Sequence, residues 1–158
     1  MPRVSVVMAV HNAADYLPQA LASLRWQTIT DWECVAVDDG STDGSADVLH
    51  RFAERDARFR VMSQAKAGIT AALTLGDAAA RCDTIARMDS DDVALPTRLE
   101  RQLGHLESHP ECVGVGAQVM LIDPTGAPIG VAPHATEHAE IERRLLAAEG
   151  GTIAHPTL

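Results

Sequence analysis

Residues 4–45 read VSVVMAVHNAADYLPQALASLRWQTITDWECVAVDDGSTDGS. This stretch begins with an apolar, valine-rich run at Val4–Val10, and a second such run follows at Glu33–Val37. Continuous apolar runs of this length are typical of strands buried on both faces of a sheet. Between them, the leucines of Asp15–Gln27 recur on one face of a helix. The order of strand, helix and strand predicts a parallel β-α-β unit.

The same alternation continues along the rest of the chain. Further strands are predicted at Arg60–Ser63, Thr84–Met88 and within the apolar run Val113–Ile122, where glycines permit close packing. Helices are predicted around Val48–Ala53, over Ile69–Arg81, after Pro96 and over Thr136–Ala148, although Gly76 weakens the second of these. A tight turn is predicted at Asp123–Gly126. We therefore expect one α/β domain over residues 1–158, with a mainly parallel sheet and helices on both faces.

Composition excludes several other classes of protein. The net charge of −9 argues against a nucleic-acid partner, because an acidic surface repels phosphate backbones. No apolar run reaches the roughly 18 residues of a membrane span, and the apolar start is too short for an export signal, which predicts a cytoplasmic protein. The three cysteines (Cys34, Cys82 and Cys112) are widely spaced, so we expect buried free thiols and no disulfide framework.

Two acidic segments, Asp38–Asp43 and Asp89–Asp92, each follow a predicted strand. In a parallel sheet both would lie at the same edge, where ligands of open α/β sheets bind. So many carboxylates on one edge would repel one another unless a divalent cation lay among them. Mg²⁺ and Mn²⁺ prefer carboxylate oxygens and share their remaining positions with phosphates and water. The D-x-D pattern Asp89-Ser90-Asp91 could hold such a cation and neutralise a diphosphate.

Each acidic segment also has a plainer interpretation. Asp89–Asp92 could be a solvated loop that caps the helix after Pro96. An EF-hand is rejected, because Val93 and Ala94 stand where a ligand and the invariant glycine are needed. Asp38-Asp39 could be a turn with local hydrogen bonds, or could supply the carboxylate that accepts the N3–H of uracil. Asp43 and Ser45 favour capping of the following helix over ligand contact.

Other chemical motifs fail. The pairs His105/His109 and His134/His138 lack the His-Glu-x-x-His pattern, so neither indicates a metal site. Gly114-x-Gly116 has no third glycine and begins a predicted strand instead of ending one, which excludes a dinucleotide fingerprint. The chain has no phosphate-binding Gly-x-x-x-x-Gly-Lys-Ser/Thr loop and no Gly-x-Ser-x-Gly elbow.

Taken together, three segments resemble family 2 glycosyltransferases of the GT-A fold. Residues 4–45 are similar to the opening of that family, and residues 84–110, TIARMDSDDVALPTRLERQLGHLESHP, to its D-x-D segment and following helix. Ile153-Ala154-His155-Pro156-Thr157 resembles a later His-Pro-Thr segment. The resemblance covers essentially the whole chain, in order. It implies a Rossmann-like GT-A sheet that is incomplete at its C-terminal side.

The resemblance also implies a set of site residues. Asp39 matches the acid that contacts uracil, and Asp38 is its neighbour. Asp91 is the better match for the direct metal ligand, and Arg87 could meet an acid or a phosphate. The implied nucleotide-sugar-binding residues are Ala9, His11, Asp38, Asp39, Lys66 and Asp89, of which His11-Asn12 ends the first strand. The implied metal ligands are Asp89 and Asp91, for Mn²⁺ or Mg²⁺.

The chemistry that the resemblance implies is inverting transfer of a sugar from a nucleotide sugar, commonly a UDP-sugar, to an acceptor hydroxyl of a glycan or lipid-linked glycan. In the family the catalytic base lies downstream of the His-Pro-Thr segment, so the sequence gives no catalytic residue up to Leu158. We expect this portion alone to bind donor without turnover, and to self-associate through an exposed sheet edge. The full protein could lie at the cytoplasmic face of a membrane.

Two rival functions remain open at this point. A non-catalytic GT-A-like binding or regulatory module would keep the fold without the base. A nucleotidyltransferase that makes sugar nucleotides is disfavoured, because Val10-His11-Asn12-Ala13 has neither the glycines nor the lysine of its phosphate loop.

Overall fold

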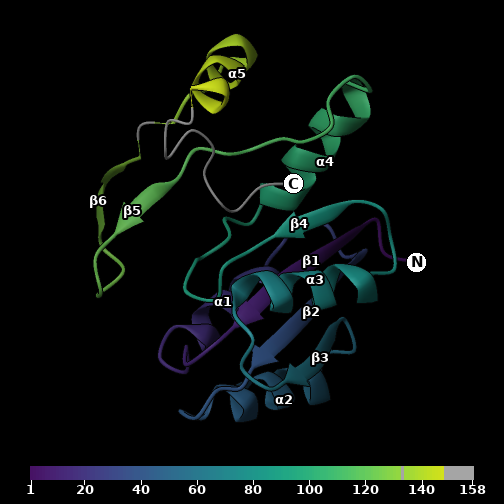
Figure 1. Cartoon of the computed structure of the whole chain (residues 1–158), viewed down its shortest axis with the longest axis vertical. Coiled ribbons are helices and arrows are strands. Elements are labelled where there is room, and N and C mark those ends of the chain that lie inside the picture. The colour runs from purple at the N-terminus through teal and green to yellow at the C-terminus, as the bar shows by residue number, and fades with distance from the viewer. Residues whose placement is uncertain (133, 148–158) are drawn as a thin grey trace.

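The central element is a sheet of four parallel strands in the order β3-β2-β1-β4, seen in the computed structural model in Figure 1. The structure describes residues 1–132 and 134–147. The strands are β1 (Val4–Val10), β2 (Trp32–Asp39), β3 (Phe59–Gln64) and β4 (Ile85–Arg87). All four were predicted, but β2 runs further than its apolar core, so that both of its final aspartates are paired within the sheet.

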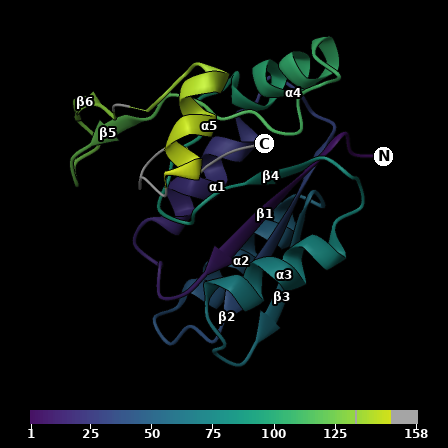
Figure 2. The ribbon, with the colours of Figure 1, turned by 45° about the horizontal axis from the view of Figure 1, so that its top comes forward.

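Helices cover both faces of this sheet, as predicted (Figures 1 and 2). The helices α1 (Leu17–Arg25), α2 (Ser45–Arg55) and α4 (Arg98–Ser108) share one apolar core with β1, β2 and β4. The helix α3 (Ile69–Ala79) packs on the opposite face, against Val35 and Val37 of β2. The last described helix, α5 (His138–Leu146), is shorter than predicted and buries no residue.

The order of the strands fixes where a ligand can bind. From β1 the chain steps through β2 to β3 on one side, and then returns across the other face to place β4 on the far side of β1. The carboxyl ends of β1 and β4 therefore flank the point where the strand order reverses. Crevices at such a switch point are where open α/β sheets bind their ligands.

The strand predicted within Val113–Ile122 is mostly absent. Residues 113–119 form no strand, and only Met120–Ile122 (β5) pairs, antiparallel with Pro128–Val131 (β6). This hairpin lies apart from the central sheet and exposes its apolar side chains (Figure 1). An apolar run forms a strand only where a neighbour supplies hydrogen bonds, and the described residues supply one only to its end. The predicted turn at Asp123–Gly126 is confirmed, with the Gly126 N–H donating to the Asp123 carbonyl.

Two composition-based expectations can be checked directly. The cysteines are all free, but only Cys34 is buried, whereas Cys82 and Cys112 are half-buried, so the expectation of three buried thiols was wrong for two of them. Burial raises the pKa of the Cys34 thiol to about 12, which leaves it unreactive. Within the described part of the chain, no helix has both the length and the apolar character needed to cross a bilayer.

Candidate functional site

An open pocket of about 300 Å³ lies at the switch point of the sheet. Its walls come from the end of β1, the end of β2, the start of α3 and the loop after β4; the lining residues are Ala9, Val10, His11, Asp39, Ile69, Asp89, Ser90 and Asp91. The two acidic segments that the sequence singled out, which are 50 residues apart at Asp39 and Asp89, thus meet in one place. Parallel pairing of β2, β1 and β4 produces this convergence, because it brings all their carboxyl ends to one edge.

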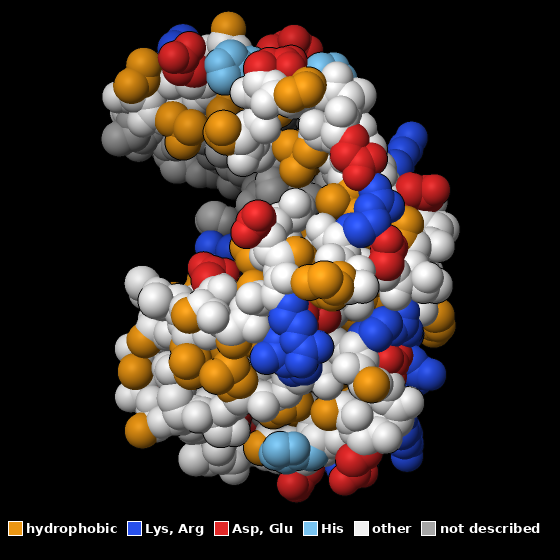
Figure 3. All heavy atoms as spheres, turned by 90° about the vertical axis from the view of Figure 1, so that its right-hand side faces the viewer, with side chains coloured by type: hydrophobic (Ala, Val, Ile, Leu, Met, Phe, Trp, Pro, Cys, Tyr) orange, Lys and Arg blue, Asp and Glu red, His pale blue; other side chains and the backbone are white. Residues whose placement is uncertain are grey.

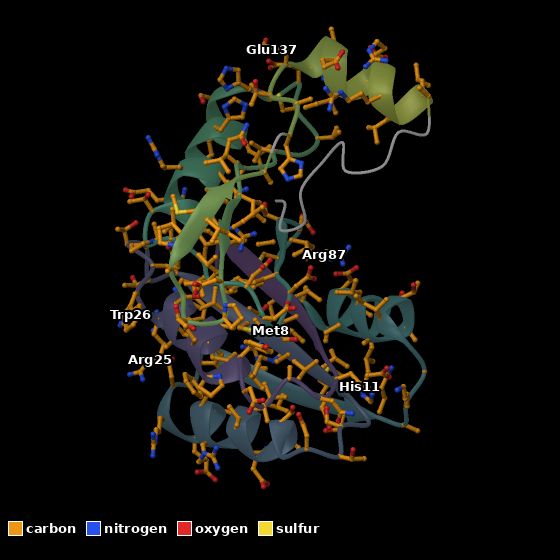
Figure 4. All side chains as sticks on the ribbon, turned by 90° about the vertical axis from the view of Figure 1, so that its left-hand side faces the viewer. Met8, His11, Arg25, Trp26, Arg87 and Glu137 are labelled. Atoms are coloured by element: carbon orange, nitrogen blue, oxygen red, sulfur yellow. The ribbon has the colours of Figure 1, made fainter. Side chains whose placement is uncertain are left out.

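His11 links two walls of the pocket. Its Nδ1 lies 2.9 Å from the main-chain oxygen of Asp39, and because a carbonyl only accepts, Nδ1 carries the proton. The Nε2 atom is then the acceptor for Lys66 Nζ at 2.6 Å. Gly40 lets the main chain of Lys66 approach the loop after β2: it has φ +67°, and a Cβ there would lie 2.8 Å from the backbone nitrogen of Lys66. Figure 4 shows His11 at the end of β1, beyond the buried Met8.

Asp39 is buried and its carboxylate anchors the loop that precedes α3. Oδ1 accepts hydrogen bonds from Gln64 Nε2 (2.7 Å) and the Ala67 N–H (2.8 Å), and Oδ2 accepts one from the Gly68 N–H (2.8 Å). These hydrogen bonds hold the pKa of the Asp39 carboxyl below its usual range, and the bond from Gln64 has the largest effect. Since a carboxylate oxygen can accept two hydrogen bonds, Oδ2 has room for one further donor.

Two of the predicted binding residues do not line the pocket. Asp38 is buried and turns back on its own loop, where Oδ1 accepts the Ser41 N–H at 3.2 Å. Asp38 therefore makes the local hydrogen bond of a turn, whereas Asp39 faces the pocket. Lys66 reaches the pocket only through His11, because its exposed ammonium group bonds to the imidazole.

Asp43 satisfies the first N–H of the helix that follows it, as predicted: its Oδ1 accepts the N–H of Ser45, the first residue of α2, at 3.0 Å. Ser45 is not the N-cap residue, because that position is Gly44. In addition, Asp43 Oδ2 accepts the Ala14 N–H at 3.0 Å and Ser45 Oγ accepts the Ala13 N–H at 2.9 Å. Both side chains thus tie the loop after β1, which carries His11, to the loop after β2. Sequence spacing could not reveal this, because the partners are about 30 residues apart.

The loop after β4 concentrates negative charge. Asp89 is half-buried, with Oδ1 at 3.4 Å from Arg87 Nη2, and Asp91 is exposed. Burial, followed by repulsion from Asp89 and Asp91, raises the pKa of Asp92 to about 6. The repulsion from each of Asp89 and Asp91 contributes less to this rise in pKa than burial does, and it is the part that a cation beside them would relieve. Figure 4 shows Arg87 and His11 on the same side of the molecule.

The donor set fits a divalent cation that is shared with a ligand. Among the described residues, no group of three or more His, Cys, Asp and Glu side chains is placed to enclose a metal ion. Asp89 and Asp91 both line the pocket, and hard cations are commonly held by one or two carboxylates together with phosphate oxygens and water. The described residues of the site thus fit a hard divalent cation that takes its remaining ligands from phosphate oxygens and water.

Sequence reasoning missed three lining residues, Val10, Ile69 and Ser90. Val10 and Ser90 are neighbours of predicted residues, so their place follows once the strands are aligned. Ile69 is different: it is the first residue of α3 and is 55% exposed despite its large apolar side chain. Its position directly after a glycine at a predicted helix start was the available signal.

The sheet order, the switch-point pocket and the acids on its rim define an α/β domain whose ligand site lies at the carboxyl edge of a parallel sheet. A sequence model of the family described as Glycosyl transferase family 2 matches residues 5–153, and the chain belongs to that family. The fold class and the family that the sequence suggested are thereby confirmed. The His-Pro-Thr segment at 155–157 lies outside the described residues.

Relatives in bacteria support this membership. Over 102 residues the chain is 41% identical to EpsH of Bacillus subtilis (strain 168), which is named as a glycosyltransferase; the match covers 65% of this chain and 30% of EpsH. Over 157 residues it is 33% identical to the O-antigen biosynthesis glycosyltransferase WbnJ of Escherichia coli, covering 98% of this chain and 60% of WbnJ. The first three relatives are matched over 30%, 46% and 34% of their own lengths.

Solved structures share the fold. TarS residues 1–349 from Staphylococcus aureus, crystallised with UDP-GlcNAc, gives a TM-score of 0.65 at 23% identity, over 70% of this chain and 32% of TarS. The mannosyltransferase PcManGT from Pyrobaculum calidifontis, in complex with GDP-Man and Mn²⁺, gives 0.64 at 24% identity, over 78% of this chain and 36% of PcManGT. At these identities the likeness concerns the fold alone.

Proposed function

We propose that this chain is the donor-binding portion of a glycosyltransferase that takes its sugar from a nucleotide sugar, with UDP as the nucleotide. The observation that carries the proposal is the convergence of Asp39, Asp89 and Asp91 on one pocket at the switch point. A hydrogen-bond acceptor for the nucleobase at one end and a cation site at the other match the two ends of a nucleoside diphosphate. The UDP-GlcNAc and GDP-Man complexes of the structural neighbours support this type of ligand.

At the base end of the pocket, Asp39 is the acceptor for a ring N–H such as N3–H of uracil. Its carboxylate is ionised, is fixed by three hydrogen bonds, and has a free acceptor position on Oδ2. The backbone of Ala9 and the ring of His11 form the adjoining wall. Lys66 does not line the pocket, but its ammonium group, bonded to His11 Nε2, places positive charge behind this wall. Asp38 supports the turn behind Asp39 and makes no ligand contact.

At the diphosphate end, Asp89 and Asp91 would hold Mn²⁺ or Mg²⁺. Such a cation neutralises the diphosphate and stabilises it as a leaving group. Asp89 is held in place by Arg87, and Asp91 projects from the exposed part of the loop. The Mn²⁺ in the PcManGT complex supports a divalent cation in this fold.

The reaction that we propose is inverting transfer to an acceptor hydroxyl of a glycan or lipid-linked glycan. Relatives from Erwinia amylovora and Escherichia coli are named for amylovoran and O-antigen biosynthesis, which supports a role in polysaccharide synthesis. The base that deprotonates the acceptor would come from the segment that follows the donor-binding portion in the family. Because nucleotide sugars are cytosolic, we place the reaction in the cytoplasm or at the cytoplasmic face of a membrane.

The test is a calorimetric titration of UDP into this chain, with Mn²⁺ and then with EDTA. We expect Mn²⁺ to tighten UDP binding in the parent chain. Asp91→Asn removes one carboxylate of the cation site, so we expect it to reduce that metal-dependent gain by about tenfold or more, since even outer-layer partners of metal ligands are worth about 10- to 100-fold.

The matched control is Asp83→Asn, which removes the same charge from an exposed residue in the turn before β4, at the amino end of the sheet. The control should bind UDP and Mn²⁺ like the parent. If Asp91→Asn retains the full metal-dependent gain, or if Asp83→Asn loses as much, the site assignment is wrong.

A further inference from the structure

Gln27 is a buried polar side chain that lies just past the C-terminal end of α1. Its amide makes three hydrogen bonds, one back to α1 and two to the distant segment at the start of α4. Nε2 donates to the Leu95 carbonyl at 2.8 Å and to the Ser23 carbonyl at 3.3 Å, while Oε1 accepts the Leu99 N–H at 3.0 Å. A single side chain therefore joins the end of α1 to the beginning of α4.

This contact replaces a missing helix cap. The first N–H groups of a helix have no partner within it and are usually satisfied by a side chain at the N-cap. The N-cap residue of α4, Thr97, makes no such bond. The Leu99 N–H in the first turn is bonded instead to Gln27, which is 72 residues away in sequence. Thr28 adds a second link, because its N–H donates to the Pro96 carbonyl at 2.9 Å.

Ser23 lies one helical turn before Gln27 and bonds to the chain between the acidic loop and α4. Its buried Oγ accepts the Ala94 N–H at 3.0 Å. At the other end of the acidic loop, the Met88 N–H donates to the Val7 carbonyl of β1 at 3.1 Å. The stretch that carries Asp89 and Asp91 is thus fixed on β1 at one side and on α1 at the other.

We propose that Gln27, together with Ser23, is a positioning residue that sets the separation of Asp89 and Asp91 for the cation and diphosphate. Neither side chain lines the pocket, so each acts through the backbone between Ala94 and Leu99. The argument rests on the proposed function, because it assigns Gln27 a role in the same site. It also gives α1 a purpose beyond packing: the helix that follows the His11 loop holds the opposite, acidic wall of the pocket.

The test uses Gln27→Glu and, as a milder second variant, Ser23→Ala. Gln27→Glu keeps an acceptor for Leu99 but turns a carboxylate oxygen toward the Leu95 carbonyl. For each chain we would measure the Kd for UDP in EDTA divided by the Kd for UDP in Mn²⁺. We expect this ratio to fall about tenfold in Gln27→Glu, with the Kd in EDTA unchanged. Amide hydrogen exchange should quicken at Ala94 and Leu99 more than in the strands.

The matched control is Glu33→Gln, an isosteric exchange at a buried residue near the amino end of β2, where the carboxylate accepts bonds from Ser5 Oγ and the Arg81 N–H. Variants would be compared at equal distance below their unfolding temperatures. The positioning role is overturned if the Kd ratio falls as far in Glu33→Gln as in Gln27→Glu. It is also overturned if Gln27→Glu keeps the ratio of the parent chain. Unchanged exchange at Ala94 and Leu99 overturns it whatever the chain binds. A parent chain that binds UDP without metal dependence overturns the cation site and the role of Gln27 with it, whereas a folded parent chain that binds no UDP overturns the proposed function itself.

Discussion

At the scale of single residues, Asp39 has the most connections in the pocket. Its main-chain oxygen fixes the tautomer of His11, and its carboxylate holds the N–H groups of Ala67 and Gly68. The loops after β1, β2 and β3 are therefore joined through one residue. A change at Asp39 would disturb all three loops, which makes it a poor choice for testing ligand binding alone.

Asp43 allows a cleaner test of how the bonds between these loops stabilise the fold, because it joins two of the same loops but lies outside the pocket. Bonds from Ser45 and from the Ala14 N–H lower the pKa of the Asp43 carboxyl from 3.8 to about 2. A group whose pKa is lower in the folded chain stabilises the fold above its unfolded pKa, and this stabilisation is lost as the pH falls through the folded value.

We therefore expect Asp43→Asn to unfold more easily than the parent at pH 7, with a difference that shrinks between about pH 4 and pH 2. The measurement is the free energy of unfolding in urea across this pH range. Asp83→Asn serves again as the exposed control and should follow the parent. A deficit in Asp43→Asn that stayed constant down to pH 2 would show that charge is not the cause.

At the scale of elements, α3 has a weak sequence signal but is tightly constrained in its packing against β1. The glycine at position 76 weakens a helix by propensity, yet the structure requires it. A Cβ at Gly76 would lie 2.5 Å from Cγ1 of the buried Val7 in β1. The helix can lie this close to the sheet only because position 76 has no side chain.

Replacing this glycine should therefore destabilise the protein although it improves helix propensity. For Gly76→Ala we expect a net loss of about 1–2 kcal/mol, since overpacking costs about 1–3 kcal/mol and the gain in propensity is at most about 1 kcal/mol. The measurement is chemical unfolding. The control is Gly104→Ala in α4, where a Cβ meets no atom within 4 Å. It should stabilise by about 0.5–1 kcal/mol, and a loss there, or a gain at position 76, would contradict this account.

At the scale of the whole molecule, the central sheet occupies one part, and the β5–β6 hairpin and α5 lie apart from it (Figure 1). Apolar side chains of the hairpin are exposed, with Ile129 at 67% and Val131 at 61%. Further apolar side chains are visible on the upper part of the face in Figure 3. The strand β4, at one edge of the sheet, is also only three residues long.

Such a surface should cause the chain to associate at high concentration. We expect sedimentation velocity to show growing complexes as concentration rises, and Ile129→Lys to shift them toward monomer while changing stability by less than about 0.5 kcal/mol. Ala57→Lys adds the same charge at an exposed residue after α2 and should leave association unchanged. A chain that sediments as a monomer at every concentration would refute the expectation.

The sequence alone determined the elements that residues close together in the chain define, such as a strand buried on both faces or a helix with one apolar face. Val4–Val10 was predicted as a buried strand from its length and valine content, and the leucines of α1 were predicted to share one helical face, and the structure has both. It also predicted that two acidic segments would share one edge of the sheet, because carboxyl ends of parallel strands coincide. Asp39, Asp89 and Asp91 followed from that rule and from the family resemblance.

The tertiary structure alone decided which of these acids face the pocket and what holds them there. Asp38 and Asp39 are adjacent in β2, yet successive strand residues point to opposite sides, so only one of them lines the site. Gln27 accepts a hydrogen bond from the first turn of α4, and Asp43 accepts one from the loop after β1. Both bonds join residues that are far apart along the chain. Periodicity and spacing report neighbours in sequence, whereas hydrogen bonds between loops depend on where the folded sheet brings them together.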